Sequence, residues 1–207
     1  MQDMPLQQFL DELASAAPTP GGGGAAAIMG AMGAALISMV ANLTIGKKGY
    51  EAVESEMQAQ LAESEGLRAR LTGMVADDVG AFNQLMAAYR LPKETASEKA
   101  DRTVAIQEGL KQATRVPLAC AHACAEVIRV ARRSAEHGNR NVISDTGAGV
   151  LALQAALRSA ALNVDINVPM IKDMAFVASA RKEIDGLLQE FLPLGESVLA
   201  HVKSRMG

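Results

Sequence analysis

The sequence predicts an all-α protein: a compact helical bundle with long kinked helices, forming a single domain over residues 1–207. Apolar residues recur at helical spacing along almost the whole chain, and no stretch alternates convincingly as a strand would. Apolar residues make up 49% of the composition, but aromatic residues only 3%, and tryptophan is absent. A core of this composition has to be built from helices packed closely through small side chains.

The first half of the chain predicts three helices. A short amphipathic helix is expected over residues 6–13, with Pro5 at its first position. A second, rich in alanine and glycine, follows the four glycines at 21–24 and has small residues at every fourth position. A third runs from about 51 to 89, where Leu91-Pro92 ends it.

The second half predicts three more. Thr95 and Glu98 form a capping box for a fourth helix, which is expected to kink at Pro117 and stop near Gly138. A fifth helix is expected to start near residue 145 and carries a second row of small residues. The last begins after residue 173 and is interrupted at Pro193. Two faces of small residues suit a tight bundle and favour an oligomer.

Charge and hydropathy exclude several classes of protein. A net charge of −3 argues against nucleic-acid binding. Residues 25–45 are uncharged and long enough to span a membrane, but their alanine, glycine and polar content makes them only weakly hydrophobic. The N-terminus carries acidic residues where a signal peptide would be basic. We therefore expect a cytoplasmic protein with no membrane or nucleic-acid partner.

The cysteines do not predict a metal site. Cys120 and Cys124 are four residues apart, and His122 between them points to another face of the helix. Two thiols without further ligands make a poor zinc site, so buried small residues are the better interpretation. We expect no metal and no cofactor.

The glycines at 21–24 are the main candidate for a ligand site. Gly21, Gly22, Gly23 and Gly24 lie directly before a helix, where bare backbone N–H groups can bind an anion or a carbonyl group. A flexible linker is the alternative. The ligand hypothesis predicts that Gly22→Val obstructs binding and strains a positive φ.

Asp78 is the most informative single side chain. It falls in the middle of the apolar stripe of the third helix, whereas Asp77 projects to the flank. A structural hydrogen bond to a helix end would explain it, and so would a carboxylate with a raised pKa that transfers protons.

Other polar residues have equally ordinary explanations. Ser144 or Asp145 could simply cap the fifth helix. Asn163 and Asn167 could bind a heterocycle or close a helix terminus. Beyond these, Lys47 and Lys48 suit a helix C-terminus as well as an anionic ligand.

The order of these motifs resembles the cyclodeaminase/cyclohydrolase family of folate enzymes along nearly the full chain. The motifs that carry the resemblance are Pro18-Thr-Pro-Gly-Gly-Gly-Gly, Asn42-Leu-Thr-Ile-Gly-Lys-Lys48, Asp78-Val-Gly-Ala-Phe82, Leu91-Pro-Lys93, Val116-Pro-Leu118, Gly138-Asn139, Ser144-Asp145 and Leu162-Asn-Val-Asp-Ile-Asn167. The resemblance implies an all-helical dimer acting on a tetrahydrofolate derivative. Gly24 and Gly49 depart from the pattern, since many relatives carry Ser and a basic residue there.

The resemblance implies hydrolysis of 5,10-methenyltetrahydrofolate to 10-formyltetrahydrofolate. Two alternatives stay open: a formiminotetrahydrofolate cyclodeaminase that releases ammonia, and a non-catalytic folate-binding helical module. Asp78 and Asp145 are the expected catalytic acids. The residues expected to bind the substrate are Gly21, Gly22, Gly23, Gly24, Asn42, Lys47, Lys48, Phe82, Ser144, Asn163 and Asn167.

Overall fold

The computed structural model describes residues 4–206, and this part of the chain contains helices and no strand. The all-α prediction is therefore confirmed. The elements are α1 (Leu6–Leu13), α2 (Gly22–Asn42), η1 (Glu51–Val53), α3 (Glu54–Tyr89), α4 (Ala96–His137), η2 (Arg140–Val142), α5 (Ile143–Asn167), η3 (Val168–Met170) and α6 (Met174–Met206), the η elements being short 3-10 turns.

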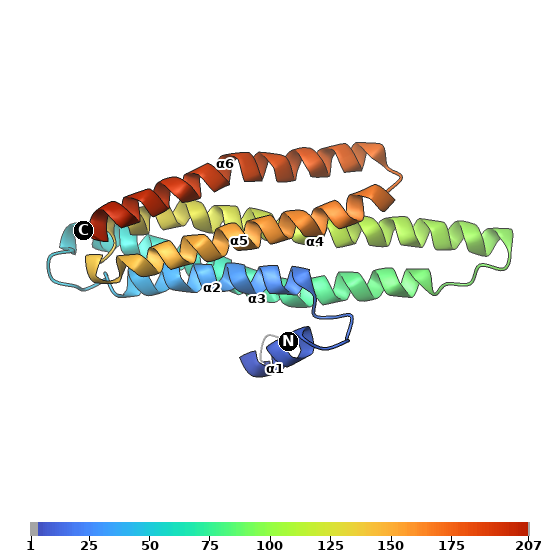
Figure 1. Ribbon diagram of the computed structural model, residues 1–207, viewed down its shortest axis with the longest axis horizontal. Coiled ribbons are helices and arrows are strands. Elements are labelled where there is room, and N and C mark those ends of the chain that lie inside the picture. The colour runs from blue at the N-terminus through green and yellow to red at the C-terminus, as the bar shows by residue number, and fades with distance from the viewer. Residues whose placement is uncertain (1–3, 207) are drawn as a thin grey trace.

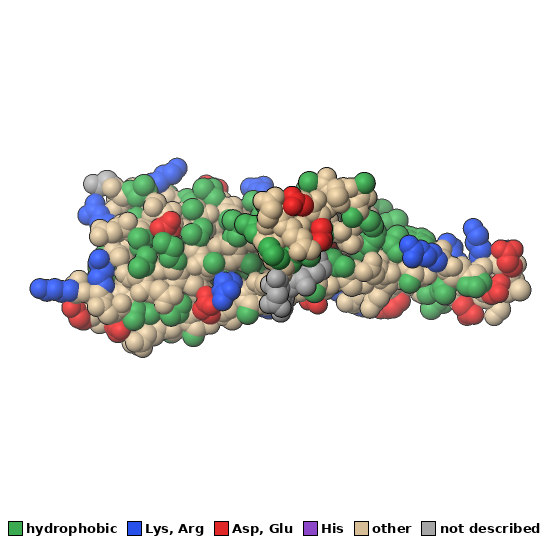
Figure 2. Space-filling model, turned by 90° about the horizontal axis from the view of Figure 1, so that it is seen from below, with side chains coloured by type: hydrophobic (Ala, Val, Ile, Leu, Met, Phe, Trp, Pro, Cys, Tyr) green, Lys and Arg blue, Asp and Glu red, His purple; other side chains and the backbone are tan. Residues whose placement is uncertain are grey.

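The long helices pack side by side into an elongated bundle (Figure 1). Helix α2 packs against α3 and α5, α4 packs against α3 and α5, and α6 covers α4 and α5. The tip of the α3–α4 hairpin extends beyond the other helices at the right of Figure 1, and it forms the narrow end of the molecule at the right of Figure 2. Helix α1 lies apart from the long helices, and Phe9 joins it to the buried core.

Helices α2 and α5 approach each other almost backbone to backbone. A Cβ added to Gly33 would stand 2.6 Å from Leu153 Cγ and 2.9 Å from the Gly149 carbonyl oxygen. A Cβ on Gly149 would in turn stand 3.1 Å from the Gly33 carbonyl oxygen. The close packing expected from the small residues is thus present, because glycine leaves the necessary space.

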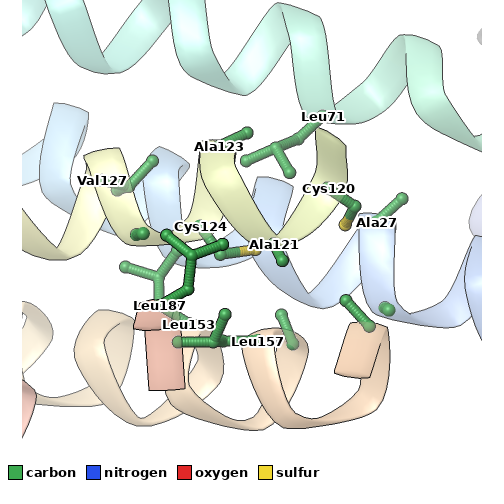
Figure 3. Packing of buried hydrophobic residues seen from close by; sticks show 14 of the residues in the cluster. Ala27, Leu71, Cys120, Ala121, Ala123, Cys124, Val127, Leu153, Leu157 and Leu187 are labelled. Atoms are coloured by element: carbon green, nitrogen blue, oxygen red, sulfur yellow. The ribbon is translucent and has the colours of Figure 1, made fainter. Parts of the chain in front are cut away.

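The core combines alanine with a few large aliphatic residues. Figure 3 shows Leu71, Cys124 and Leu153 converging from α3, α4 and α5. Helix α2 is long and apolar enough to cross a membrane, with a hydropathy of 1.8, but 61% of that stretch is buried inside the bundle. Its apolar composition therefore has a core-forming explanation.

The helix ends both confirm and correct the sequence predictions. The capping box is present: Thr95 Oγ1 accepts the Glu98 N–H at 3.2 Å, and Glu98 Oε2 accepts the Thr95 N–H at 2.8 Å. The prediction that Ser144 or Asp145 caps α5 is wrong, because that helix already begins at Ile143 and places both in its first turn.

Two further corrections concern glycine and proline. Three of the four glycines lie inside α2 as its first residues, with Gly21 as the N-cap, instead of preceding the helix. The chain passes through Pro193 without leaving the helix, so α6 is not interrupted there. A proline at that position costs one backbone hydrogen bond, and the packing of the rest of α6 outweighs that loss.

Candidate active site

One pocket brings together half of the predicted site residues. Its cavity of about 340 Å³ lies between the first turn of α2, the second half of α3, the middle of α4 and the end of α5. This volume suits a small organic ligand. The lining residues are Pro18, Thr19, Gly21, Gly22, Gly23, Asp78, Ala81, Phe82, Leu85, Met86, Tyr89, Ala113, Asn163, Ile166, Asn167 and Met170.

A wider surface hollow of about 730 Å³ lies between α3 and α4 and is the weaker candidate. Its arginines already have carboxylate partners: Arg133 pairs with Glu63, and Arg132 pairs with Glu136 at 2.7 Å. Exposed pairs of this kind are ordinary surface features. Space alone therefore does not identify the site, and the polar groups of the smaller pocket do.

Asp78 lies against the glycine turn, which is the start of α2 at Gly21, Gly22, Gly23 and Gly24. The Gly24 N–H donates to Asp78 Oδ2 at 3.0 Å, which is the structural hydrogen bond to a helix end that the sequence left open. A Cβ added to Gly23 would stand 2.1 Å from Asp78 Oδ1, so only glycine allows the carboxyl group to lie so close. Gly24 is buried and acts through this bond, whereas the other three glycines line the pocket.

The environment of Asp78 raises the pKa of its carboxyl group. Burial is the larger cause, because it disfavours the charged form, and the hydrogen bond from Gly24 opposes it by lowering the pKa. The net shift is upward, so Asp78 holds a proton more readily than an exposed aspartate does. Asp77, one residue earlier, is exposed. The structural hydrogen bond is therefore present, and the raised pKa is compatible with proton transfer by Asp78, which stays a prediction.

The two asparagines present a defined polar atom to the pocket. Asn163 Nδ2 donates to the Ser159 carbonyl oxygen at 2.8 Å, and Asn167 Nδ2 donates to the Asn163 carbonyl oxygen at 2.8 Å. Because both amide nitrogens donate to the backbone, the side-chain oxygens are free to accept from a ligand, and Asn163 also keeps one N–H. The pocket therefore offers hydrogen-bond acceptors at the end of α5.

Phe82 and several residues missed by the sequence analysis form the apolar wall. Phe82 and Tyr89 lie seven residues apart on α3 and therefore on one face, a spacing that could have revealed Tyr89. Ile166 and Met170 contribute from the far side although both are exposed. Flat aromatic and apolar surfaces suit a heterocyclic ligand.

The remaining predicted residues lie at the opposite end of the bundle. Asn42 is the last residue of α2, which at 21 residues is about 30 Å long. The start of α5 meets this end, because Asn139 Nδ2 donates to the Leu43 carbonyl oxygen at 2.8 Å. Within one chain, the structure therefore separates a distal group of residues from the pocket. That group is Asn42, Lys47, Lys48, Ser144 and Asp145.

The cysteines are structural. Cys120 and Cys124 are free thiols buried in the core. The hydrogen bond with Cys120, followed by burial, raises the pKa of the Cys124 thiol well above its ordinary value. Neutral buried thiols are poor nucleophiles and poor metal ligands. Within residues 4–206, no cluster of three histidine, cysteine or acidic side chains could hold a metal ion.

Comparison with known proteins identifies the family. The family described as formiminotransferase-cyclodeaminase matches residues 5–186 of this chain. The chain belongs to this family. Among members of the formiminotransferase-cyclodeaminase family, a methenyltetrahydrofolate cyclohydrolase of Methylorubrum extorquens is 59% identical over 97% of both chains. Two bifunctional members match less closely.

Those members, the formimidoyltransferase-cyclodeaminases of Sus scrofa and Rattus norvegicus, are 37% and 35% identical, and this chain covers only 37% and 38% of their length. The fold of the family is also seen in a crystal structure of formiminotetrahydrofolate cyclodeaminase from Thermotoga maritima. It superposes with a TM-score of 0.82 at 33% identity, over 99% of this chain and 96% of that one. The formiminotransferase-cyclodeaminase resemblance noted in the sequence is thus confirmed.

Proposed function

We propose that this chain is an enzyme that hydrolyses 5,10-methenyltetrahydrofolate to 10-formyltetrahydrofolate in one-carbon metabolism, and that it acts in the cytoplasm. The observation that carries the proposal is the 59% identity with a methenyltetrahydrofolate cyclohydrolase, because it covers 97% of both chains. The pocket supports it with a carboxyl group that can exchange a proton beside an apolar wall.

The chemistry needs one base near the reacting carbon. That carbon bridges N5 and N10 of the substrate in a cationic amidinium group, and water adds to it. Asp78 accepts a proton from the attacking water and returns it to N5 as the bond between the carbon and N5 breaks. The hydroxyl proton leaves to solvent as the formyl carbonyl forms, so one proton is released per turnover. The negative charge of Asp78 also stabilises the cation before water adds.

The other lining groups position the substrate. The side-chain oxygens of Asn163 and Asn167 accept hydrogen bonds from N–H groups of the pterin ring, while Phe82 and Tyr89 contact its faces. The N–H groups of Gly22 and Gly23 open α2 and can donate to a carbonyl oxygen of the substrate.

One assay distinguishes this activity from the alternatives. We expect the purified protein to accelerate the loss of methenyltetrahydrofolate absorbance, and to act slowly or not at all on formiminotetrahydrofolate. Rapid ammonia release from the second compound would make the chain a cyclodeaminase, which acts on the same carbon with an amino group in place of hydroxyl. Tight binding of both compounds without turnover would make it a non-catalytic folate-binding module.

We also propose that the enzyme is a homodimer formed through the outer faces of α2 and α5. Helix α5 exposes Ala148, Leu151, Ala155, Arg158 and Leu162 at alternating spacings of three and four residues, a pattern typical of helices that pack against a partner. Helix α2 adds Met32, which is 57% exposed, as well as Ala35 and Met39. Apart from Arg158 this face is apolar, and an apolar face of this length is rarely left open to water.

An antiparallel dimer would unite the two halves of the predicted site. The middle of the exposed stripe, near Ala35 and Ala155, lies about halfway between the pocket and the distal group. A two-fold axis there would place Lys47 and Lys48 of the partner subunit beside the pocket. No lysine or arginine lines the pocket in the described chain, and both lysines lack an ion pair there. The carboxylates of a folate glutamate tail supply the matching charge.

Ala155→Arg tests the dimer. Two guanidinium groups near the axis would repel each other and should give a monomer in sedimentation, with a raised KM for methenyltetrahydrofolate. Ala178→Arg on the exposed face of α6 is the matched control and should stay dimeric. A dimeric Ala155→Arg protein with normal kinetics would place the interface elsewhere.

Subunit mixing tests whether the site is shared. Asp78→Asn chains and Lys47→Ala/Lys48→Ala chains should each have low activity alone. Random mixing should recover about a quarter of the wild-type activity, because half the dimers are mixed and each has one intact site. No recovery on mixing would mean that the lysines do not act across the interface.

A further inference from the structure

Pro117 leaves a backbone carbonyl of α4 without its usual partner. It is buried in the interior of a helix that continues from Ala96 to His137. In such a helix the N–H of residue 117 would bond the carbonyl oxygen of Ala113, four residues earlier, but proline has no N–H. This partly buried carbonyl oxygen needs another donor. Ala113 lies in the wall of the pocket, so the missing hydrogen-bond donor is missing at the site itself.

The side chain of Asn167 supplies the missing donor. Its Nδ2 donates to the Ala113 carbonyl oxygen at 3.0 Å and to the Asn163 carbonyl oxygen at 2.8 Å. Both partners are carbonyl oxygens, which can only accept hydrogen bonds. The orientation of the amide is therefore fixed by chemistry: the NH₂ group must face the backbone, and both of its hydrogens are used.

The consequence for the pocket is a fixed acceptor. Asn167 lines the cavity, and within residues 4–206 no donor bonds its Oδ1. If Ala113 were satisfied within its own helix, one N–H of the Asn167 amide would be free for a ligand, and only the bond to the Asn163 carbonyl oxygen would hold the orientation of the amide. A pocket that always presents the oxygen selects a ligand with an N–H donor at this point, and it rejects one with an acceptor or an apolar group there.

We propose that Pro117 is a positioning residue that acts through Asn167, orienting its side-chain oxygen toward the 2-amino and ring N–H edge of the bound pterin. The proposal rests on the folate activity proposed above. It also explains why α4 keeps a proline in its interior, where proline ordinarily destabilises a helix. The proline lowers the stability of the helix, and in return the Asn167 oxygen is already oriented before the ligand binds, which favours binding.

Pro117→Ala is the direct test. The backbone N–H of the new alanine can bond the Ala113 carbonyl oxygen, and this frees one N–H of the Asn167 amide. We expect the melting temperature to stay the same or rise, kcat to change less than about twofold, and KM to rise about tenfold, the effect of one misplaced hydrogen bond. A merely structural proline would instead change stability and leave KM alone.

Ligand discrimination gives the sharper measurement. Equilibrium binding is measured with 5-formyltetrahydrofolate and with its analogue in which a methyl group replaces the 2-amino group. The wild-type protein should prefer the first, whereas Pro117→Ala and Asn167→Ala should lose most of this preference. The double variant should be no weaker than Asn167→Ala alone, because the two residues act in sequence.

The outcomes separate this proposal from the proposed function. Wild-type protein that neither binds nor converts folates would refute the function. Wild-type protein that does so, beside a Pro117→Ala variant with unchanged preference, would refute the role of Pro117 alone. If that variant fails to fold, nitrogen-15 NMR of the unmodified protein decides: the Asn167 side-chain NH₂ protons should be protected from exchange, and rapid exchange would overturn the proposal.

Discussion

Asp78→Asn should lower kcat by about 10²–10⁴-fold while the fold stays intact, because the amide keeps the shape of the carboxyl group and cannot accept a proton. The side-chain oxygen of asparagine can still accept the Gly24 N–H, so the contact with the glycine turn need not be lost. Rates of methenyltetrahydrofolate hydrolysis and circular dichroism of the same samples check both statements. Asp77→Asn is the matched control, since Asp77 is exposed and its substitution should change neither the rate of hydrolysis nor the fold.

The pH dependence of stability has a defined sign for Asp78. Its pKa is raised in the folded protein, mainly by burial, so the folded state binds the proton more tightly than the unfolded state does. Its contribution to stability is therefore fully present at low pH and is lost as the pH rises through the folded-state pKa. At neutral pH, Asp78→Asn should melt at the same temperature as the wild type or higher, and this advantage should vanish in acid.

Asp145→Asn tests the rival acid. Asp145 lies in the first turn of α5, where its charge interacts with the helix dipole, and losing that charge should cost only about 0.3–1 kcal/mol of stability. Near-normal turnover in Asp78→Asn beside a large loss of turnover in Asp145→Asn would show that Asp145, and not Asp78, is the catalytic acid. A lower melting temperature with normal turnover in Asp78→Asn would leave only the structural hydrogen bond.

Gly23→Ala should lower the activity nearly as much as Asp78→Asn does, although it adds a single methyl group. That group would stand 2.1 Å from Asp78 Oδ1 and 2.6 Å from its Cγ, so the carboxyl group has to move and lose its bond to Gly24. We expect kcat to fall by about 10²-fold and the free energy of unfolding to fall by about 1–3 kcal/mol, the cost of overpacking. Steady-state kinetics and chemical denaturation measure the two effects.

Gly22→Ala is the matched control. A Cβ there would make ordinary contacts of 3.6 Å with the side chain of Asn163. Gly22 is helical, so the positive φ expected from the sequence is wrong, and among the described glycines Gly46 and Gly49 have that conformation. Alanine inside a helix is favoured over glycine by about 0.5–1 kcal/mol. Equal damage from the two variants would show that the turn needs flexibility and not the close approach to Asp78.

Much of the fold could be predicted from periodicity and helix-end signals. The stripe that placed Asp78 inward and Asp77 outward depends on helical geometry alone, and the capping box at Thr95 depends on two side chains close in sequence. The errors lie where tertiary packing overrides a local signal. Pro193 reads as an interruption, yet α6 continues because its neighbours hold it in place.

The site was harder to predict because its parts lie far apart along straight helices. The glycine turn, Asp78 and the asparagines were found individually, and the structure brings them to one pocket. The distal lysines and Asp145 carry the same kind of signal, but α2 holds them about 30 Å away in the same chain. Sequence motifs give residue types, whereas the separation of those residues depends on helix length, and their pairing in the proposed dimer depends on its symmetry.

The backbone contact of α2 with α5 at Gly33 and Gly149 determines how the pocket responds to its ligand. The two helices meet through the glycine backbone and through the side chains of Leu153 and Ile37 packed against it, so sliding or spreading them would break these close contacts. We therefore expect the glycine turn and the asparagines, which end these helices at the pocket, to keep nearly the same separation when substrate binds. A pocket of constant width should discriminate against a ligand that is one methyl group too wide, and it should bind the correct one without a closing motion.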